Sequence, residues 1–257
     1  MRTLQLTLPL LLLATTAHAG AVLKVDARDS SGKTSPSEVW YAQDGMLRVD
    51  SLDSRGEVTR SEIVRDNAIW RVNPGAKTYS RLDQQSVKAM FGARQEQMDA
   101  MLARLPPDKR AALEARMQKV QGGASDFSLV DTGKTDQSGK YSCHVWQQLH
   151  GSTPFMDFCV VPASSLPDGA DLAASLQKAL DTLNQVLSGV PQLAKAADHI
   201  TRLGKMGGFP VRTRELSSTG APENERVLTS AQAQALPPDK FAIPQGFTEA
   251  APGKEGE

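Results

Sequence analysis

The residues best suited to nucleophilic, redox or metal chemistry are few in this chain of 257 residues, which holds two cysteines and four histidines. His144, His150 and His199 include no pair with the i, i+4 helical spacing that places two imidazoles on one metal ion. The sequence has no Gly-x-Ser-x-Gly nucleophile motif, no phosphate-binding loop and no dinucleotide fingerprint. We therefore predict no catalytic residue, no metal site and no cofactor.

Carboxylate pairs are the remaining candidates for acid–base chemistry. Asp50 and Asp53, and likewise Glu223 and Glu225, are close in sequence but lie beside turn residues. A paired acid–base site needs two carboxyl groups with different pKa values in one cleft. Solvated loops are the simpler interpretation of these pairs. An enzyme that uses Asp50, His144 or Glu223 stays an alternative to the binding functions considered below.

The two cysteines, Cys143 and Cys159, fall in two predicted strands joined by turn residues. A hairpin centred near Gly151 places Cys143 directly opposite Cys159, which predicts a cross-strand disulfide. Such a bond persists in an oxidising compartment, whereas a redox-active pair needs a closer spacing such as Cys-x-x-Cys. The same register pairs Val145 with Asp157 and Trp146 with Met156.

The charge of the chain is balanced, with 29 Lys and Arg against 29 Asp and Glu. Nucleic-acid binding depends on clustered basic residues that neutralise phosphates. The composition therefore predicts no nucleic-acid partner. An apolar content of 40% is enough to form a globular core.

The first 19 residues have the pattern of a secretory signal peptide: Arg2, an apolar run from Leu4 to Leu13, and the small-residue end Ala17-His18-Ala19. The run is shorter than the roughly 20 residues of a spanning helix. We expect a periplasmic or secreted protein with no transmembrane segment after cleavage. The predicted division is a signal peptide over 1–19, one domain over 20–249 and a disordered tail over 250–257.

Alternating apolar and polar residues, separated by turn dipeptides, indicate an antiparallel meander in the first third of the chain. Asp44-Gly45 is the strongest hairpin signal, because both positions of a tight primed turn need positive φ. On the strand that follows, Leu47 and Val49 point to one side and Arg48 to the other. The six predicted strands cover 22–28, 37–42, 46–52, 57–64, 68–72 and 77–82.

Two later regions change to the three- and four-residue spacing of helices. The first, 83–121, is divided at Pro106-Pro107, and the second, 165–204, at Gly189-Val-Pro191. Ser165 and Asp168 have the spacing of a capping box, and the second region carries an apolar stripe of Leu172, Leu176, Leu180, Leu183 and Leu187. Further strands are predicted over 126–131, 140–147, 155–161, 209–216, 225–230 and 242–247. This separation of strands from helices predicts a single-domain α+β fold.

Methionines and aromatic residues are the candidates for contact with a hydrophobic ligand. Met90, Met98 and Met101 fall on an apolar helical stripe, and thioether surfaces adapt to varied apolar ligands. Almost all aromatic residues fall in predicted strands, where they line a ligand groove or belong to an ordinary core. The predicted ligand set is Leu47, Val49, Trp70, Tyr79, Met90, Met98, Met101, Trp146 and Phe158.

Several short motifs carry a resemblance to a known family. They are Tyr41-x-x-Asp44-Gly45-Met46-x-Arg48, Ile69-Trp70-x-Val72, Gly139-x-Tyr141-x-Cys143-x-x-Trp146, Phe209-Pro-Val211 and Phe241-x-Ile243-Pro244-x-Gly246-Phe247. The chain resembles exported bacterial proteins of the domain of unknown function 4412 family. That family is similar in turn to the LolA-like lipoprotein carriers. The resemblance implies a curved antiparallel sheet, or half-barrel, with the two inserted helical pairs covering one face. Some relatives bind acyl chains under this cover.

Two functional hypotheses follow from different classes. In the first, a non-enzymatic periplasmic protein binds a lipid or other hydrophobic ligand between its sheet and helices. In the second, the core is solid and an outer face or sheet edge contacts an envelope protein partner or senses stress. An apolar cavity of several hundred Å³ between sheet and helices would distinguish the first from the second.

Overall fold

The computed structural model describes residues 19–113, 115, 127–190, 193, 201–202 and 204–252. Three predictions therefore lie wholly or largely outside the described residues. They are the signal peptide over 1–19, the shorter helix that precedes Gly204, and the disordered tail over 250–257.

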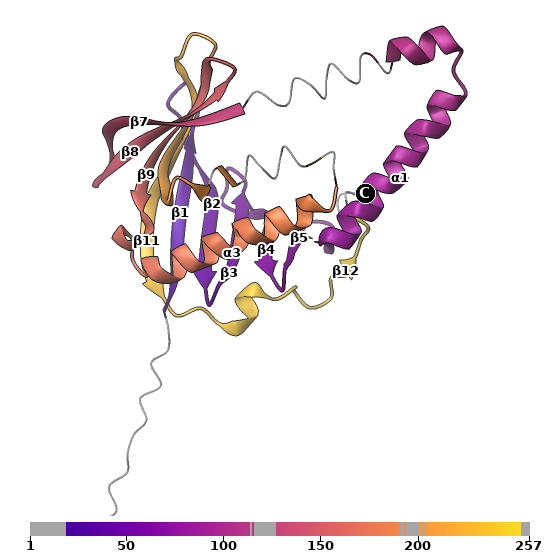
Figure 1. The fold of residues 1–257 in the computed structure, drawn as a ribbon. Helices are drawn as coiled ribbons and strands as arrows, with labels where there is room; N and C mark the ends of the chain where they lie inside the picture. Colours follow the sequence, from indigo (N-terminus) through magenta and orange to yellow (C-terminus); the bar gives the residue numbers. More distant parts are fainter. Residues whose placement is uncertain are drawn as a thin grey trace, which may run out of the picture.

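One curved, open sheet dominates the fold, which confirms the α+β class (Figure 1). Within the described residues it has twelve strands in the order β12-β6-β5-β4-β3-β2-β1-β11-β10-β9-β8-β7. All neighbours run antiparallel except β12 and β6, which are parallel. The strands are β1 (Gly20–Arg28), β2 (Thr34–Gln43), β3 (Met46–Leu52), β4 (Val58–Arg65), β5 (Ala68–Asn73), β6 (Thr78–Leu82), β7 (Phe127–Ser138), β8 (Tyr141–His150), β9 (Thr153–Pro162), β10 (Gly208–Leu216), β11 (Pro222–Gln234) and β12 (Thr248–Glu249).

The turn at Asp44-Gly45 joins β2 to β3 as the sequence predicts. Both residues have positive φ, 52° and 71°, which matches the twist of the hairpin. The strands then pair from Gln43 opposite Met46. Leu47 faces the larger hydrophobic cluster of the molecule, together with Val64 of β4. This turn therefore fixes which side chains of β3 enter the main core.

Helix α3 (Gly169–Ser188) lies across one face of the sheet, in contact with β1 to β5 (Figure 1). We call this side the helical face. The buried side of α3 consists of Leu172, Ser175, Ala179, Thr182 and Val186. Leu172 is the only residue of the predicted leucine stripe that is buried, so the helix is rotated relative to the prediction. Small side chains share the buried side with Leu172 and Val186, and Leu176 and Leu183 pack against the same core while partly exposed.

The predicted capping box at the start of α3 is wrong. Ser165 belongs to a short 3₁₀ helix, η1 (Ala163–Ser165), and its hydroxyl donates to the Pro162 carbonyl. Asp168 precedes α3 with a positive φ of 51° and caps it with no side-chain hydrogen bond. A Cβ atom at Gly169 would clash with the Ala163 carbonyl. The tight packing between η1 and α3, which no local pattern encodes, sets this helix start.

Helix α1 (Gln84–Ala103) projects away from the sheet, and Val87 is its one buried residue (Figure 1). Its start follows local rules: Asp83 accepts from the Ser86 N–H at 2.8 Å, and the Ser86 hydroxyl accepts from the Asp83 N–H at 2.9 Å. Helical structure resumes after Pro106-Pro107 over 107–113, as predicted. Unlike α3, α1 does not cover the sheet.

The C-terminal segment packs on the opposite side of the sheet, which we call the far face. A 3₁₀ helix, η3 (Pro238–Phe241), places Phe241 against Val22, Ile63 and Val72. The strand predicted over 242–247 is wrong: Pro244 lacks the N–H that a paired strand needs, and the chain pairs only later, in β12.

Arg48 fixes the C-terminal segment to the far face. Its guanidinium donates to Asp50 at 2.6 Å, to the Ser61 hydroxyl at 3.0 Å and to the Lys240 carbonyl at 2.9 Å. Asp50 is 2% exposed. Lys240 Nζ lies 3.8 Å from the Asp50 carboxylate and 3.5 Å from the centre of the Tyr41 ring. One buried carboxylate therefore holds two cations: Arg48, which donates to the C-terminal segment, and Lys240, which belongs to it.

The Cys143–Cys159 disulfide is present, with Cα atoms 5.2 Å apart. The predicted register is wrong by two residues, because Val145 lies opposite Cys159 and Trp146 opposite Phe158, not opposite Asp157 and Met156. A two-residue turn pairs His150 with Thr153, and a bulge after Gln148 shifts the register further. A shift of two residues keeps every side chain on its predicted face. The cysteines therefore meet diagonally instead of directly.

An ion-pair network connects the edge strand β7 to β9 and β10, which are not its neighbours in the sheet order. Arg212 donates to the Asp136 carboxylate at 2.5 Å and to the Gln137 carbonyl at 3.2 Å. Arg214 donates to both oxygens of Asp157, which is 5% exposed. The Arg212 guanidinium lowers the pKa of Asp136, and the bonds to Asp157 raise the pKa of Arg214. These contacts bring β7, β9 and β10 together on one side of the sheet.

Candidate functional site

An apolar groove lies beside α3 on the helical face, between that helix and the start of β10. It has a volume of about 290 Å³. Leu176 and Leu180 form its helical wall, and Trp40 and Phe209 line it from the sheet. The Trp40 and Phe209 rings meet edge to face with centroids 5.5 Å apart, a favoured aromatic geometry. The remaining lining residues are Ala163, Ala173, Gln177, Gly204, Met206, Gly207, Gly208 and Pro210.

The groove results from the distribution of large and small residues along α3 and β10. Ala179 and Ser175 seat α3 on the sheet, so Leu176 and Leu180 lie on its flank. On the opposite wall, a Cβ atom at Gly208 would clash with the Val161 carbonyl. Glycine therefore lets the start of β10 approach β9 closely. Phe209 of this wall is itself buried, whereas Trp40, Leu176 and Leu180 are half-buried and present apolar surface to the groove.

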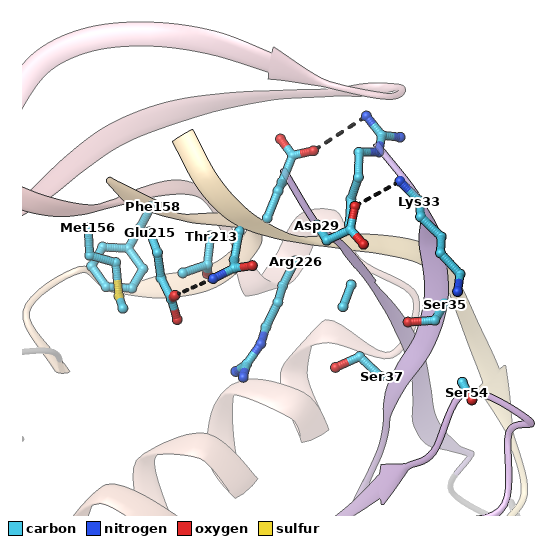
Figure 2. Close-up of a pocket in the computed structure, with 14 residues that line it drawn as sticks. Asp29, Lys33, Ser35, Ser37, Ser54, Met156, Phe158, Thr213, Glu215 and Arg226 are labelled. Carbon is cyan, nitrogen blue, oxygen red and sulfur yellow. Dashed lines mark hydrogen bonds and ion pairs between the residues drawn. The ribbon is translucent and has the colours of Figure 1, made fainter. Parts of the chain in front are cut away.

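A second, more polar cavity of about 550 Å³ lies at the ends of β1, β2, β10 and β11. We call it the trough. Figure 2 shows Phe158 and Met156 on one side of it, Lys33 and Ser35 on the other, and Arg226 between them. The other lining residues are Ala27, Arg28, Asp29, Ser37, Ser54, Thr213, Glu215, Asn224 and Glu225.

The carboxylates of the trough already have partners. Asp29 accepts from the Ser31 hydroxyl at 2.6 Å and from the Lys33 N–H at 3.0 Å, and these bonds lower its pKa. Glu225 lies 3.5 Å from Arg28. Glu215 accepts from the Asn224 amide at 2.8 Å. These three carboxylates therefore already form hydrogen bonds or ion pairs with other residues of the protein.

A chain of polar contacts connects the groove to the trough. The Trp40 indole N–H donates to Glu38 at 2.9 Å, and the other Glu38 oxygen lies 3.3 Å from Arg226. Trp40 lines the groove, whereas Arg226 lines the trough. Ser37 of the trough is three positions from Trp40 on β2, which is about 10 Å along an extended strand. The two cavities are therefore connected through Glu38, which contacts one lining residue of each.

Predicted ligand residues on the sheet fall on both of its faces. Leu47 and Val49 belong to the core beneath α3. Trp70 and Tyr79 lie in the smaller cluster of the far face, with ring centroids 5.9 Å apart. The Arg65 and Arg81 guanidiniums lie 5.3 and 5.5 Å from the centre of the Trp70 ring. These residues do not form one site.

The other predicted ligand residues are also dispersed. Met90, Met98 and Met101 lie on the projecting helix α1, where Met101 is 45% exposed. Trp146 lies opposite Phe158 in the β8–β9 pair. Of the nine predicted residues, Phe158 alone lines either of the two cavities described above.

Sequence reasoning left Trp40 open between a core and a ligand groove, placed Leu176 and Leu180 on an apolar helical stripe, and did not assign Phe209 to a site. The signal that could have found the groove is the alternation of small residues with leucines along α3. Ser175, Ala179 and Thr182 recur at the spacing of one helical face, and Leu176 and Leu180 lie on the adjoining one. The opposite wall comes from β10, more than 25 residues later in the chain, so its position depends on tertiary structure.

Comparisons with known proteins identify a similar solved structure but no family. No protein-family model matches the chain, and the search of curated proteins also found no match. The chain is similar to an uncharacterized conserved protein from Thermus thermophilus at 9% identity and a TM-score of 0.44. The alignment covers 91% of this chain and 90% of that one.

Searches for metal sites and membrane spans gave no candidate in the described part of the chain. No group of three or more His, Cys, Asp or Glu side chains could hold a metal ion there. No helix among those residues is long and apolar enough to cross a membrane.

Proposed function

We propose that this is a non-enzymatic, exported protein that binds a lipid, acyl chain or other hydrophobic ligand in the groove between α3 and β10. The observation that carries the proposal is the groove itself. Leu176, Leu180, Trp40 and Phe209 give it mainly apolar walls. Its volume of about 290 Å³ is at the lower end of ordinary ligand sites. Partly exposed leucines on α3 gain further burial when an apolar ligand fills the groove.

Export and family membership belong to the same proposal. The Cys143–Cys159 disulfide supports an oxidising compartment such as the periplasm. The signal pattern over 1–19 supports cleavage and secretion. The motifs around Tyr41, Trp70 and Tyr141 support membership of the domain of unknown function 4412 family, and the curved sheet with α3 on one face is compatible with a LolA-like architecture.

Native mass spectrometry of protein exported into a bacterial envelope tests the proposal. We expect co-purifying lipid in the wild type and its loss in Leu180→Asp, which places a charge in the groove. Leu187→Asp is the matched control, because it makes the same change on the same helix but outside the groove lining. Protein that is consistently empty, and that binds no fluorescent fatty-acid probe in vitro, would contradict the proposal.

The alternative function, an envelope interaction module, is favoured by the edge strand β7. Among the described residues β7 pairs with β8 alone in the sheet order, and its Val130 side chain is 41% exposed. An extended segment of a partner could add to this edge through main-chain hydrogen bonds. Crosslinking in cells tests this function. A reproducible partner that is lost on Val130→Pro would support it, whereas recovery of no partner would contradict it.

A further inference from the structure

We propose that the trough binds an anionic group and that the ligand of the groove is therefore an anionic amphiphile, with its chain beside α3 and its head group in the trough. This inference rests on the proposed function. It adds the chemical class of the ligand, which the apolar groove alone does not specify.

The first step is the balance of charge in the trough. Its carboxylates are engaged: Asp29 by the turn that it caps, Glu215 by Asn224 and Glu225 by Arg28. Its cations are less completely engaged. Arg226 contacts Glu38 at 3.3 Å and keeps a side chain 57% exposed, and Lys33 has no hydrogen bond or ion pair from its ammonium group within the described residues. The cavity is lined by three cations and three carboxylates, so it has no formal surplus of positive charge; its unused donors are the Lys33 ammonium and the exposed part of the Arg226 guanidinium.

Hydroxyl groups add to these unused donors. Ser35, Ser37 and Thr213 line the trough, and their side chains make no hydrogen bond within the part of the chain that the structure describes. Ser35 and Lys33 lie on the same side of the cavity in Figure 2. A carboxylate, phosphate or sulfate offers several acceptor oxygens, and hydrogen bonds in which a partner is ionised are stronger than neutral ones.

The second step is continuity with the groove. The distance from Ser37 to Trp40, about 10 Å along β2, is within the length of a short alkyl chain. Phe158 and Met156 give one wall of the trough an apolar surface against which the first carbons of such a chain can pack. The Trp40–Glu38–Arg226 contacts lie between the two cavities. A single-chain amphiphile can therefore place its head group near Arg226 and its tail beside Trp40.

Binding of dodecyl phosphate, dodecanol and inorganic phosphate to the full exported protein distinguishes the contributions of head and tail. The two long-chain probes are used below the concentrations at which they form micelles. The Trp40→Phe variant identifies the part of the tryptophan fluorescence signal that comes from the groove. We expect dodecyl phosphate to bind about tenfold or more tightly than dodecanol. Higher salt should reduce that preference, because the charged contacts are solvent-accessible.

Two substitutions test the trough directly. Arg226→Gln and Lys33→Gln should each reduce the preference for dodecyl phosphate severalfold and leave dodecanol binding unchanged. Arg94→Gln on α1 and Lys178→Gln on α3 are the matched controls, because they remove the same charges away from both cavities. All four residues are solvent-accessible, and circular dichroism checks that each variant is folded.

Each outcome supports or overturns the inference. Equal binding of dodecanol and dodecyl phosphate by the wild type, with loss of both in Leu180→Asp, would overturn the anionic head group and leave the proposed function intact. If neither the long-chain probes nor inorganic phosphate bound, both proposals would be contradicted. If inorganic phosphate bound in an Arg226-dependent manner while both long-chain probes failed to bind, the proposed function and the link between trough and groove would be overturned.

Discussion

Removing the Arg48 side chain should release the C-terminal segment from the far face. The guanidinium makes three hydrogen bonds, to Asp50, Ser61 and the Lys240 carbonyl, and its loss leaves Asp50 buried at 2% exposure. The remaining cation, Lys240 Nζ, is 3.8 Å from that carboxylate. Breaking a buried pair by removing one partner typically costs about 3–5 kcal/mol. Since Arg48 is 14% exposed, we expect Arg48→Met to lower the free energy of unfolding by about 3 kcal/mol.

Urea denaturation measures this change, and a double-mutant cycle isolates its cause. Asp50→Leu removes the carboxylate, so Arg48→Met should cost much less in that background. Limited proteolysis should cut Arg48→Met earlier than the wild type within 236–250, because that segment loses its anchor. A cost below about 1 kcal/mol for Arg48→Met, or equal costs in both backgrounds, would refute the idea that buried charge holds the segment.

The other predictions concern the disulfide, a helix cap and two glycines. Replacing Cys143 and Cys159 by serine should lower the free energy of unfolding by about 3 kcal/mol, from the chain-entropy relation for a loop of this size. Denaturation with and without reductant measures this change, and an unchanged denaturation midpoint would contradict the expectation. The Ser86 backbone N–H lowers the pKa of Asp83. The stabilisation of the folded protein by this helix cap is therefore fully present above the ordinary Asp pKa of about 4. It is lost as the pH falls through the lower pKa that Asp83 has in the folded protein. Asp83→Ala should cost about 1 kcal/mol at pH 7 and progressively less in acid, and a pH-independent cost would exclude the cap as its cause. Gly208→Ala should destabilise the protein by about 1–3 kcal/mol through its clash with Val161, whereas Gly92→Ala on α1, where the added Cβ meets open space, should stabilise it by up to about 1 kcal/mol. Both changes are measured by urea denaturation, and equal effects at the two glycines would show that close packing does not require glycine at position 208.

Local chemistry explains the parts of the fold that sequence reasoning predicted correctly. Asp44-Gly45 forms its turn because positive φ is needed there whatever the rest of the chain does. Pro106-Pro107 separates two helical stretches because proline disrupts the hydrogen bonding of a helix interior. The disulfide was also predictable, since two-residue periodicity fixes the face of each cysteine even where the register is wrong.

Tertiary contacts explain the errors. A bulge after Gln148 shifts the β8–β9 register, and no residue type in that hairpin identifies its position. The start of α3 depends on the close approach of Gly169 to Ala163. The nine predicted ligand residues do not form one site for a similar reason. Periodicity assigns residues to the two faces of a sheet, but it does not say which face a later segment of the chain covers. Trp70 and Tyr79 lie on the far face, where the C-terminal segment packs against them.

The position of the groove follows from one property of α3. A helix that met the sheet through its leucines would be held away from it by their size, and those leucines would be buried at the contact. In this protein Ser175, Ala179 and Thr182 occupy much of the contact, between Leu172 and Val186. Leu176 and Leu180 then face sideways, toward Trp40 and Phe209. The apolar surface that α3 offers to a ligand therefore lies at the side of the helix, and Glu38 connects Trp40 there to Arg226 of the trough.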